Sequence, residues 1–187
     1  MREPFLTAIH FTPLMDIYFL TPPSIELTNL AKTFGYTHAL FQNKDFVYGE
    51  VSTVKDAQKL VSLASSLKVL SIAKITSDNY REIIEKTNLT MITGIDQIAS
   101  SDSLHQVRGG VDQVIAPLLK ARNITLLIPF TDILHNPSAK TIARMRFNIY
   151  VAKKYKVNII LSSICLSKHD LRTVNDIHTF FKTIEKI

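Results

Sequence analysis

Short apolar runs alternate with longer amphipathic segments along the chain. The short runs predict buried β-strands because they are apolar at consecutive positions, whereas the longer segments place apolar residues at the three- and four-residue spacing of a helix. The runs that predict strands are residues 16–20, 38–42, 69–75, 89–93, 124–130 and 157–161. The segments that predict helices are residues 22–34, 53–64, 77–86, 110–121, 138–155 and 174–184.

Residues with known preferences for helix ends support several of these boundaries. Thr53 precedes Asp56 by three positions, which is the spacing of a capping box at a helix N-terminus. Gly35 follows the first helical segment, where glycine favours the left-handed conformation that ends a helix. The polar stretch from Asp96 to Arg108 interrupts the alternation and is expected to be a loop.

About six strand–helix units in succession predict parallel strands covered by helices. We therefore expect an α/β fold with one domain over residues 1–187, because 46% of the residues are hydrophobic and no linker interrupts the pattern. A doubly wound sheet and a TIM-like barrel, complete or incomplete, both fit this periodicity.

The lengths of the apolar runs and the cysteine content bear on where the protein is located in the cell. No apolar run approaches the roughly 18 residues that a membrane span requires, so we expect no membrane association. Cys165 is the only cysteine, which excludes an internal disulfide and a structural zinc site made of several cysteines. A cytoplasmic location is consistent with this cysteine usage.

The positive charge is concentrated in the second half of the chain. The net charge of +6 divides into −2 over residues 1–104 and +8 over residues 105–187. Such an asymmetry favours a polyanionic partner, although many basic proteins are merely soluble.

Several catalytic motifs are missing from the sequence. Neither a dinucleotide-binding glycine motif nor a phosphate loop ending in Gly-Lys-Ser/Thr is present. The histidines are scattered, and the run 16–20 supplies one carboxylate but no imidazole, so we expect the chain to bind no metal. Ser162, Ser163 and His169 could form a nucleophile and base, but serines at a strand end more often cap backbone groups.

Residues 138–155 predict a strongly basic helix with five cations and no acid. One apolar stripe follows helical spacing, and Lys140, Arg144 and Lys154 are expected roughly opposite it, with Arg146 on its flank. A solvated face is the simpler interpretation. Like charges without acidic partners repel each other, however, and we favour contact with phosphate groups.

The second half of the chain resembles archaeal ribonuclease P protein component 3, the homologue of the eukaryotic thirty-kilodalton subunit of that enzyme. The resemblance is specific as a set: a basic helix, Lys-Tyr-Lys-Val, an apolar strand, Ser-Ser and then Leu-Arg. The residues that carry it are 110–116, 121–123, 129–134, 144–146, 154–157, 160–163 and 170–177. At the level of element order the likeness extends from Asp16 to the C-terminus, and it is weakest over residues 89–107.

The resemblance implies a TIM-barrel-like fold related to the polymerase-and-histidinol-phosphatase class. It also implies a protein subunit, without a catalytic site of its own, of the particle that removes the 5′ leader from precursor tRNA. In that particle the catalytic RNA uses Mg²⁺, no cofactor is bound by the protein, and the subunit pairs with ribonuclease P protein component 2.

The residues expected to bind RNA are cations of the second half together with one strand-end lysine. Arg172 occupies the Leu-Arg position of the family pattern, and Arg108 precedes the glycine pair Gly109-Gly110, which leads either into a phosphate-binding helix N-terminus or into a flexible connection. The full expected set is Lys74, Arg108, Lys140, Arg144, Arg146, Lys154, Lys168 and Arg172.

Two other functions remain open from the sequence. One is a free-standing barrel phosphoesterase that depends on a metal ion. The other is an interaction subunit whose exposed apolar residues bind component 2 while its cations make no functional contact.

Overall fold

The computed structural model describes residues 15–98, 107 and 109–186. The strands are β1 (Asp16–Phe19), β2 (His38–Phe41), β3 (Phe46–Val51), β4 (Leu70–Ile75), β5 (Met91–Thr93), β6 (Thr125–Pro129), β7 (Ile159–Ser162) and β8 (Ile164–Cys165). The helices are α1 (Ile25–Thr33), α2 (Val54–Leu67), α3 (Tyr80–Lys86), α4 (Ile95–Ile98), α5 (Ile115–Ala121), α6 (Thr131–His135), α7 (Ala139–Lys154), the 3₁₀ helix η1 (Lys168–Asp170) and α8 (Val174–Lys186).

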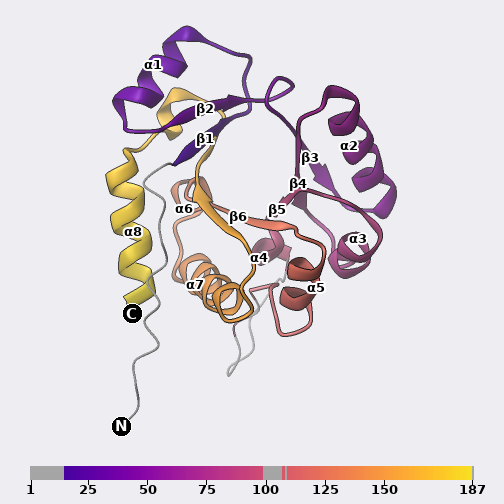
Figure 1. Ribbon diagram of the computed structural model, residues 1–187. Coiled ribbons are helices and arrows are strands. Elements are labelled where there is room, and N and C mark those ends of the chain that lie inside the picture. Colours follow the sequence, from indigo (N-terminus) through magenta and orange to yellow (C-terminus); the bar gives the residue numbers. More distant parts are fainter. Residues whose placement is uncertain (1–14, 99–106, 108, 187) are drawn as a thin grey trace.

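The strands form two parallel sheets, with the orders β2-β1-β8 and β3-β4-β5-β6-β7. They lie around a common centre with the helices outside, as Figure 1 shows. This arrangement is consistent with a TIM-barrel-like fold, although no continuous ladder closes the ring in the described residues. The strand expected over 89–93 is present as β5 and pairs with both β4 and β6.

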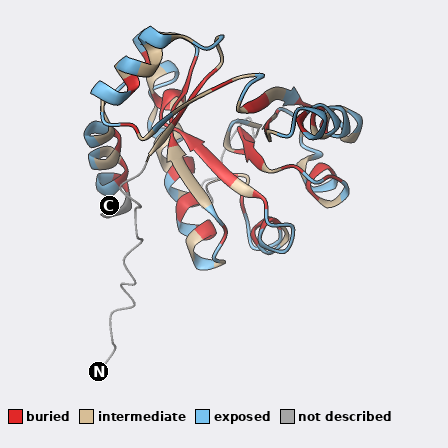
Figure 2. Cartoon of the chain, turned by 45° about the horizontal axis from the view of Figure 1, so that its top comes forward, coloured by how far each residue is buried: buried red, intermediate tan, exposed pale blue. Residues whose placement is uncertain are grey.

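Side-chain alternation along the strands separates two apolar regions. One set of side chains points into the centre of the ring and packs together there: Tyr18, Phe46, Ile72, Met91, Leu127 and Ile164. The alternate positions, such as Ile17, Phe19 and Ile92, pack against the surrounding helices. Figure 2 shows buried residues along the strands and the exposed ones on the outer sides of the helices.

The serine pair was expected to end a strand, and β7 does end at Ser162, but a further strand, β8, begins directly after Ser163. β7 pairs with β6, Ser163 follows, and β8 pairs with β1. The backbone N–H of Tyr18 donates to the carbonyl oxygen of Ser163 at 3.1 Å, and the Ser162 hydroxyl donates to the carbonyl oxygen of Asp16. The two serines therefore connect the two sheets instead of turning the chain away from them.

Three other expectations differ from the structure. Residues 46–51 form β3, which was not predicted because Gly49 and Glu50 interrupt the apolar run. The helix expected from Gly110 begins only at Ile115. The loop expected from Asp96 begins inside α4, and its residues 99–106 and 108 lie outside the described part of the chain. Within the described residues, no helix is both long and apolar enough to cross a membrane.

Candidate nucleic-acid interface on helix α7

Helix α7 begins where its sequence predicts. The Ser138 side chain accepts a hydrogen bond from the backbone N–H of Thr141 at 3.0 Å, which satisfies one of the unpaired donors of the first turn. Tyr155 ends the helix, and Lys156 follows in the left-handed conformation with φ 57°. The helix contacts α4, α6 and α8, so more than one of its sides is covered.

Arg144 does not lie on the outer face, and this part of the prediction is wrong. Its residue exposure is only 3%, and its Nη1 donates to the backbone carbonyl oxygen of Asp96 at 2.8 Å. Burial raises the pKa of the Asp96 carboxyl, and the positive charge of Arg144 opposes that rise. Arg144 therefore joins α7 to α4 inside the protein. The prediction failed because a single apolar stripe was assumed, whereas Asn148 and Val151 are buried as well.

The exposed side of α7 carries cations and one large aromatic residue. Lys140, Arg146 and Lys154 are exposed, as predicted, and Lys154 Nζ lies 5.8 Å from the centre of the Tyr155 ring. Tyr150 is 62% exposed between these cations. Tyrosine between basic residues is typical of nucleic-acid-binding surfaces. This signal was present in the sequence, but an interpretation based on charge alone did not identify it.

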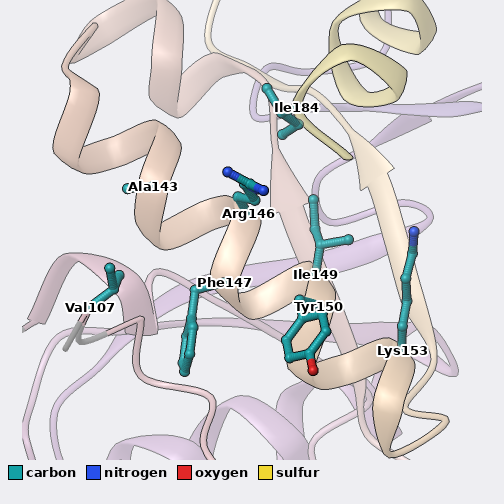
Figure 3. A pocket seen from close by; sticks show the side chains of 8 residues that line it. All are labelled: Val107, Ala143, Arg146, Phe147, Ile149, Tyr150, Lys153 and Ile184. Carbon is teal, nitrogen blue, oxygen red and sulfur yellow. The ribbon is translucent and has the colours of Figure 1, made fainter. Parts of the chain in front are cut away.

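A groove of about 360 Å³ runs beside this exposed side. Arg146 and Lys153 border it, and Phe147 and Ile149 of α7 line it together with Ile184 of α8. Figure 3 shows that most of the lining side chains come from successive turns of α7. The lining residues are Val107, Ala143, Arg146, Phe147, Ile149, Tyr150, Lys153 and Ile184. Positive charge on the border of an apolar groove suits a ligand with anionic groups beside an apolar or aromatic part.

Lys168 and Arg172 do not join this surface. Lys168 of η1 has its Nζ 3.9 Å from Glu26 Oε1, and Arg172 Nη1 donates to the carbonyl oxygens of His169 at 3.0 Å and Leu171 at 2.6 Å. Both follow the C-terminal end of β8, whereas Lys154 precedes the N-terminal end of β7. Because the strands are parallel, Lys168 and Arg172 lie at the opposite end of the ring from Lys154.

Lys74 and the glycine pair, which were expected to take part in RNA binding, make contacts within the protein. Lys74 is at the C-terminal end of β4, with its Nζ 3.1 Å from Glu50 Oε1. Arg108 lies outside the described residues. Gly109 and Gly110 are packed against other elements: a Cβ on Gly110 would lie 2.5 Å from the carbonyl oxygen of Ile95. The pair therefore permits close packing, and it does not stand at a helix N-terminus, since α5 begins five residues after Gly110.

The serine and histidine residues considered as a nucleophile and base make hydrogen bonds to other partners. The Ser162 hydroxyl donates to the carbonyl oxygen of Asp16, and the backbone N–H of His169 donates to Ser167 Oγ at 3.2 Å. In the part of the chain that the structure describes, no group of three or more His, Cys, Asp or Glu residues is placed to hold a metal ion.

No family model matches the chain, whereas a curated protein and solved structures are similar to it. Ribonuclease P protein component 3 of Methanocaldococcus jannaschii is 23% identical over 155 residues, which covers 73% of this chain and 66% of that protein, just under two thirds of its length. A chain in the structure described as "cryo-EM structure of archaeal Ribonuclease P with mature tRNA" is 20% identical, with a TM-score of 0.53, covering 90% of this chain and 82% of that one. The second match supports the fold. The resemblance to ribonuclease P protein component 3 that the second half of the chain predicts is therefore confirmed.

Proposed function

We propose that this chain is a protein subunit of ribonuclease P and supports the catalytic RNA in removing the 5′ leader from precursor tRNA. The similarity to ribonuclease P protein component 3 favours this function over that of a free-standing phosphoesterase. The observation that carries the RNA-binding part is the exposed side of α7, on which Lys140, Arg146 and Lys154 flank Tyr150 and no acidic residue occurs along the helix.

Cations on this surface would lower the repulsion between RNA phosphates that the folded RNA brings close together. Each neutralised phosphate releases counterions, so the logarithm of the affinity should fall with the logarithm of the salt concentration by about 0.7–0.9 per contact. Helical RNA hides its base edges in a deep groove, and contact would therefore be with the backbone and with unpaired bases. A particle lacking these contacts should need more Mg²⁺ to reach its active conformation.

The finer parts of the proposal follow the resemblance. The catalytic RNA would hold the Mg²⁺ that hydrolyses the phosphodiester, the protein would bind no cofactor, and component 2 would be its protein partner in the cytoplasm. The barrel would be related to the polymerase-and-histidinol-phosphatase class without retaining its hydrolytic function. Incubation of the purified chain with Mg²⁺ or Mn²⁺ and a phosphate ester tests the non-catalytic role, and sustained turnover would contradict it.

The decisive experiment replaces Lys140, Arg146 and Lys154 together with glutamate and measures precursor-tRNA cleavage by the reconstituted particle. We expect cleavage to fall at low Mg²⁺ and to recover at high Mg²⁺, with the circular dichroism spectrum unchanged. The matched control reverses Lys55 and Lys59, two exposed cations of α2, and should have little effect. Equal cleavage by both variants and the wild type would overturn the RNA-binding role of α7.

The groove beside α7 favours one alternative, an interaction subunit. Its apolar lining, including Phe147 and Ile184, is suited to a side chain of a protein partner. Tyr150→Ala separates the two functions, because it removes the exposed ring without changing the charge. Loss of component 2 from the particle, with RNA affinity unchanged, would support the interaction subunit; loss of RNA affinity would support the proposed function.

A further inference from the structure

A second cavity lies at the C-terminal ends of the strands, away from the α7 surface. Its volume is about 120 Å³, and polar side chains from several elements reach it. The C-terminal end is the side of TIM-like barrels where strand-end residues and the following loops meet to form ligand sites. The lining residues are Leu20, Tyr48, Lys74, Thr93, Gly94, Gln97, Pro129, Thr131, Asp132, His135, Ile164 and Leu166.

Strand register places three polar side chains side by side at the level of this cavity. Glu50 of β3 is paired with Lys74 of β4, and Lys74 is paired with Thr93 of β5. Each of the three lies two positions after a residue of its own strand that packs in the centre of the ring. Because side chains alternate along a strand, all three point to the inside of the ring. Beneath them the centre is apolar, with Ile72 and Met91 at the preceding inward positions of β4 and β5. The cavity thus has an apolar floor and a polar upper layer.

Thr93 is the strongest indication that this cavity holds a ligand. The residue is 3% exposed, and its Oγ1 has no hydrogen-bond partner within the described part of the chain. Most buried hydroxyl groups in proteins are hydrogen-bonded, to the protein, to an ordered water or to another bound molecule. A molecule in the cavity would supply the missing partner, since Thr93 lines it.

Lys74 determines the sign of the charge that this cavity can accept. An ammonium group has three N–H donors, and the structure gives one of them to Glu50, whose side chain is 64% exposed. The other donors can be directed to a ligand. A metal cation would be repelled by the ammonium group, whereas an anion would be attracted by it.

Asp132 faces the same cavity from the first turn of α6. Burial and the negative charge of Asp96 raise the pKa of Asp132 to about 7, against the lowering effects of Lys74, a hydrogen bond with Gln97 and the nearby His135. Near neutral pH a substantial fraction of this carboxyl is therefore protonated and can donate a hydrogen bond. The other charged or titratable groups around it are Glu50, Tyr48, and Asp170, which is bonded to His135.

We propose that this cavity binds a small tetrahedral oxyanion, of the size of phosphate or sulfate, through Lys74, Thr93 and Asp132. The cavity volume of about 120 Å³ leaves room for an ion with four oxygen atoms. Lys74 supplies the opposite charge, Thr93 donates its unused hydroxyl hydrogen, and Asp132 donates only in its neutral form. The site does not depend on the proposed binding of RNA by α7.

Binding must be coupled to proton uptake, because an ionised Asp132 would repel the anion. Sulfate is the better probe of this coupling, since its own charge is constant over the pH range in which Asp132 titrates. Calorimetric titration of the full chain with sulfate should give an affinity at least about fivefold higher at pH 6 than at pH 8. Asp132→Asn keeps a neutral side chain and should reduce this pH dependence.

The two donors are tested by variants that preserve shape. Lys74→Gln and Thr93→Val should each weaken sulfate binding at pH 6 by about tenfold. Thr93→Val removes only a hydroxyl that has no partner among the described residues, so the thermal midpoint of the variant should equal or exceed that of the wild type. Lys55→Gln removes one exposed cation elsewhere and should leave sulfate binding unchanged.

Phosphate and adenosine 5′-monophosphate distinguish a free ion from a terminal phosphate group. Binding of both probes with the same dependence on Lys74 and Thr93 would assign a site for terminal phosphates. Binding of inorganic phosphate alone would assign a free-ion site. No sulfate binding by the wild type, or equal binding by the wild type and both donor variants, would overturn the proposal.

Discussion

Arg144 donates a hydrogen bond from Nη1 to the backbone carbonyl oxygen of Asp96 across 2.8 Å, from a position that is only 3% exposed. The bond joins the long helix α7 to the short helix α4. A buried guanidinium group must keep its hydrogen bonds because no water can replace them. Arg144 therefore stabilises the fold, and the neighbouring Arg146, which is exposed, is the arginine available to a ligand.

Substitution of these two arginines should change the free energy of unfolding to different extents. Arg144→Met leaves the Asp96 carbonyl without this donor and should lower the free energy of unfolding by about 2–3 kcal/mol. Arg146→Met should change it by less than about 0.5 kcal/mol, since the residue is exposed. Urea denaturation of both variants measures the difference. Similar losses for the two variants would contradict the assignment of Arg144 to the interior.

The contact between Gly110 and Ile95 predicts a second loss of stability. Gly110 has φ +90°, and an added Cβ would lie 2.5 Å from the Ile95 carbonyl oxygen, so Gly110→Ala should cost about 2 kcal/mol or more. Gly35→Ala is the matched control: its φ is +91°, but its Cβ would be 3.6 Å from Val174. It should cost only about 1 kcal/mol. Equal losses would indicate that backbone strain alone matters at Gly110.

The salt dependence of RNA binding should reveal which cations contact phosphate. Arg146→Gln and Lys154→Gln should each reduce the slope of log affinity against log salt by about 0.7–0.9. Lys168→Gln tests the other end of the ring, where Lys168 already lies 3.9 Å from Glu26. Filter-binding measurements over a range of KCl concentrations give the slopes. An unchanged slope in the Arg146 and Lys154 variants would remove α7 from the interface.

Local features of the fold were predictable because short-range interactions determine them. The capping box of α2 is present, with the Asp56 backbone N–H donating to Thr53 Oγ1 at 3.2 Å and the Thr53 N–H donating back to Asp56 Oδ2 at 3.1 Å. Gly35 follows α1 with a positive φ, as expected for a residue that ends a helix. β3 was missed because Gly49 and Glu50 make half of it look like a turn.

The candidate site was predictable only in part, since burial on a helix depends on how many neighbours cover it. Lys140, Arg146 and Lys154 are exposed as expected, but the contacts of α7 with three helices enclose Arg144. Nothing in the spacing of apolar residues along α7 indicates that α4 supplies a carbonyl acceptor for an arginine. The cavity at the C-terminal strand ends was likewise not predicted, because Lys74, Thr93 and Asp132 are brought together only by strand register and α6.

The pair formed by His135 and Asp170 predicts one pH dependence. Burial tends to raise the pKa of Asp170, but hydrogen bonds from His135 and from the backbone N–H groups of Ser167 and Leu166 outweigh it and lower the pKa overall. A lowered pKa in the folded state stabilises the protein above the unfolded value of about 4, and this stabilisation is lost as the pH falls below it. Asp170→Asn should therefore destabilise the protein at pH 7 but much less at pH 3. A constant difference between the two proteins would exclude the ionised carboxyl as its cause.

Asp132 should show the opposite dependence, because burial and Asp96 raise its pKa to about 7. The folded state holds a proton that the unfolded state releases above pH 4, so the contribution of Asp132 to stability decreases as the pH rises from 4 through 7. Asp132→Asn cannot ionise and retains an acceptor for Gln97. The variant should match the wild type at about pH 4 and exceed its unfolding free energy at pH 8 by on the order of 1–2 kcal/mol, the side chain being only partly buried. Denaturation without added sulfate or phosphate measures this difference, and equal stability at pH 8 would show that Asp132 ionises in the folded protein at no cost.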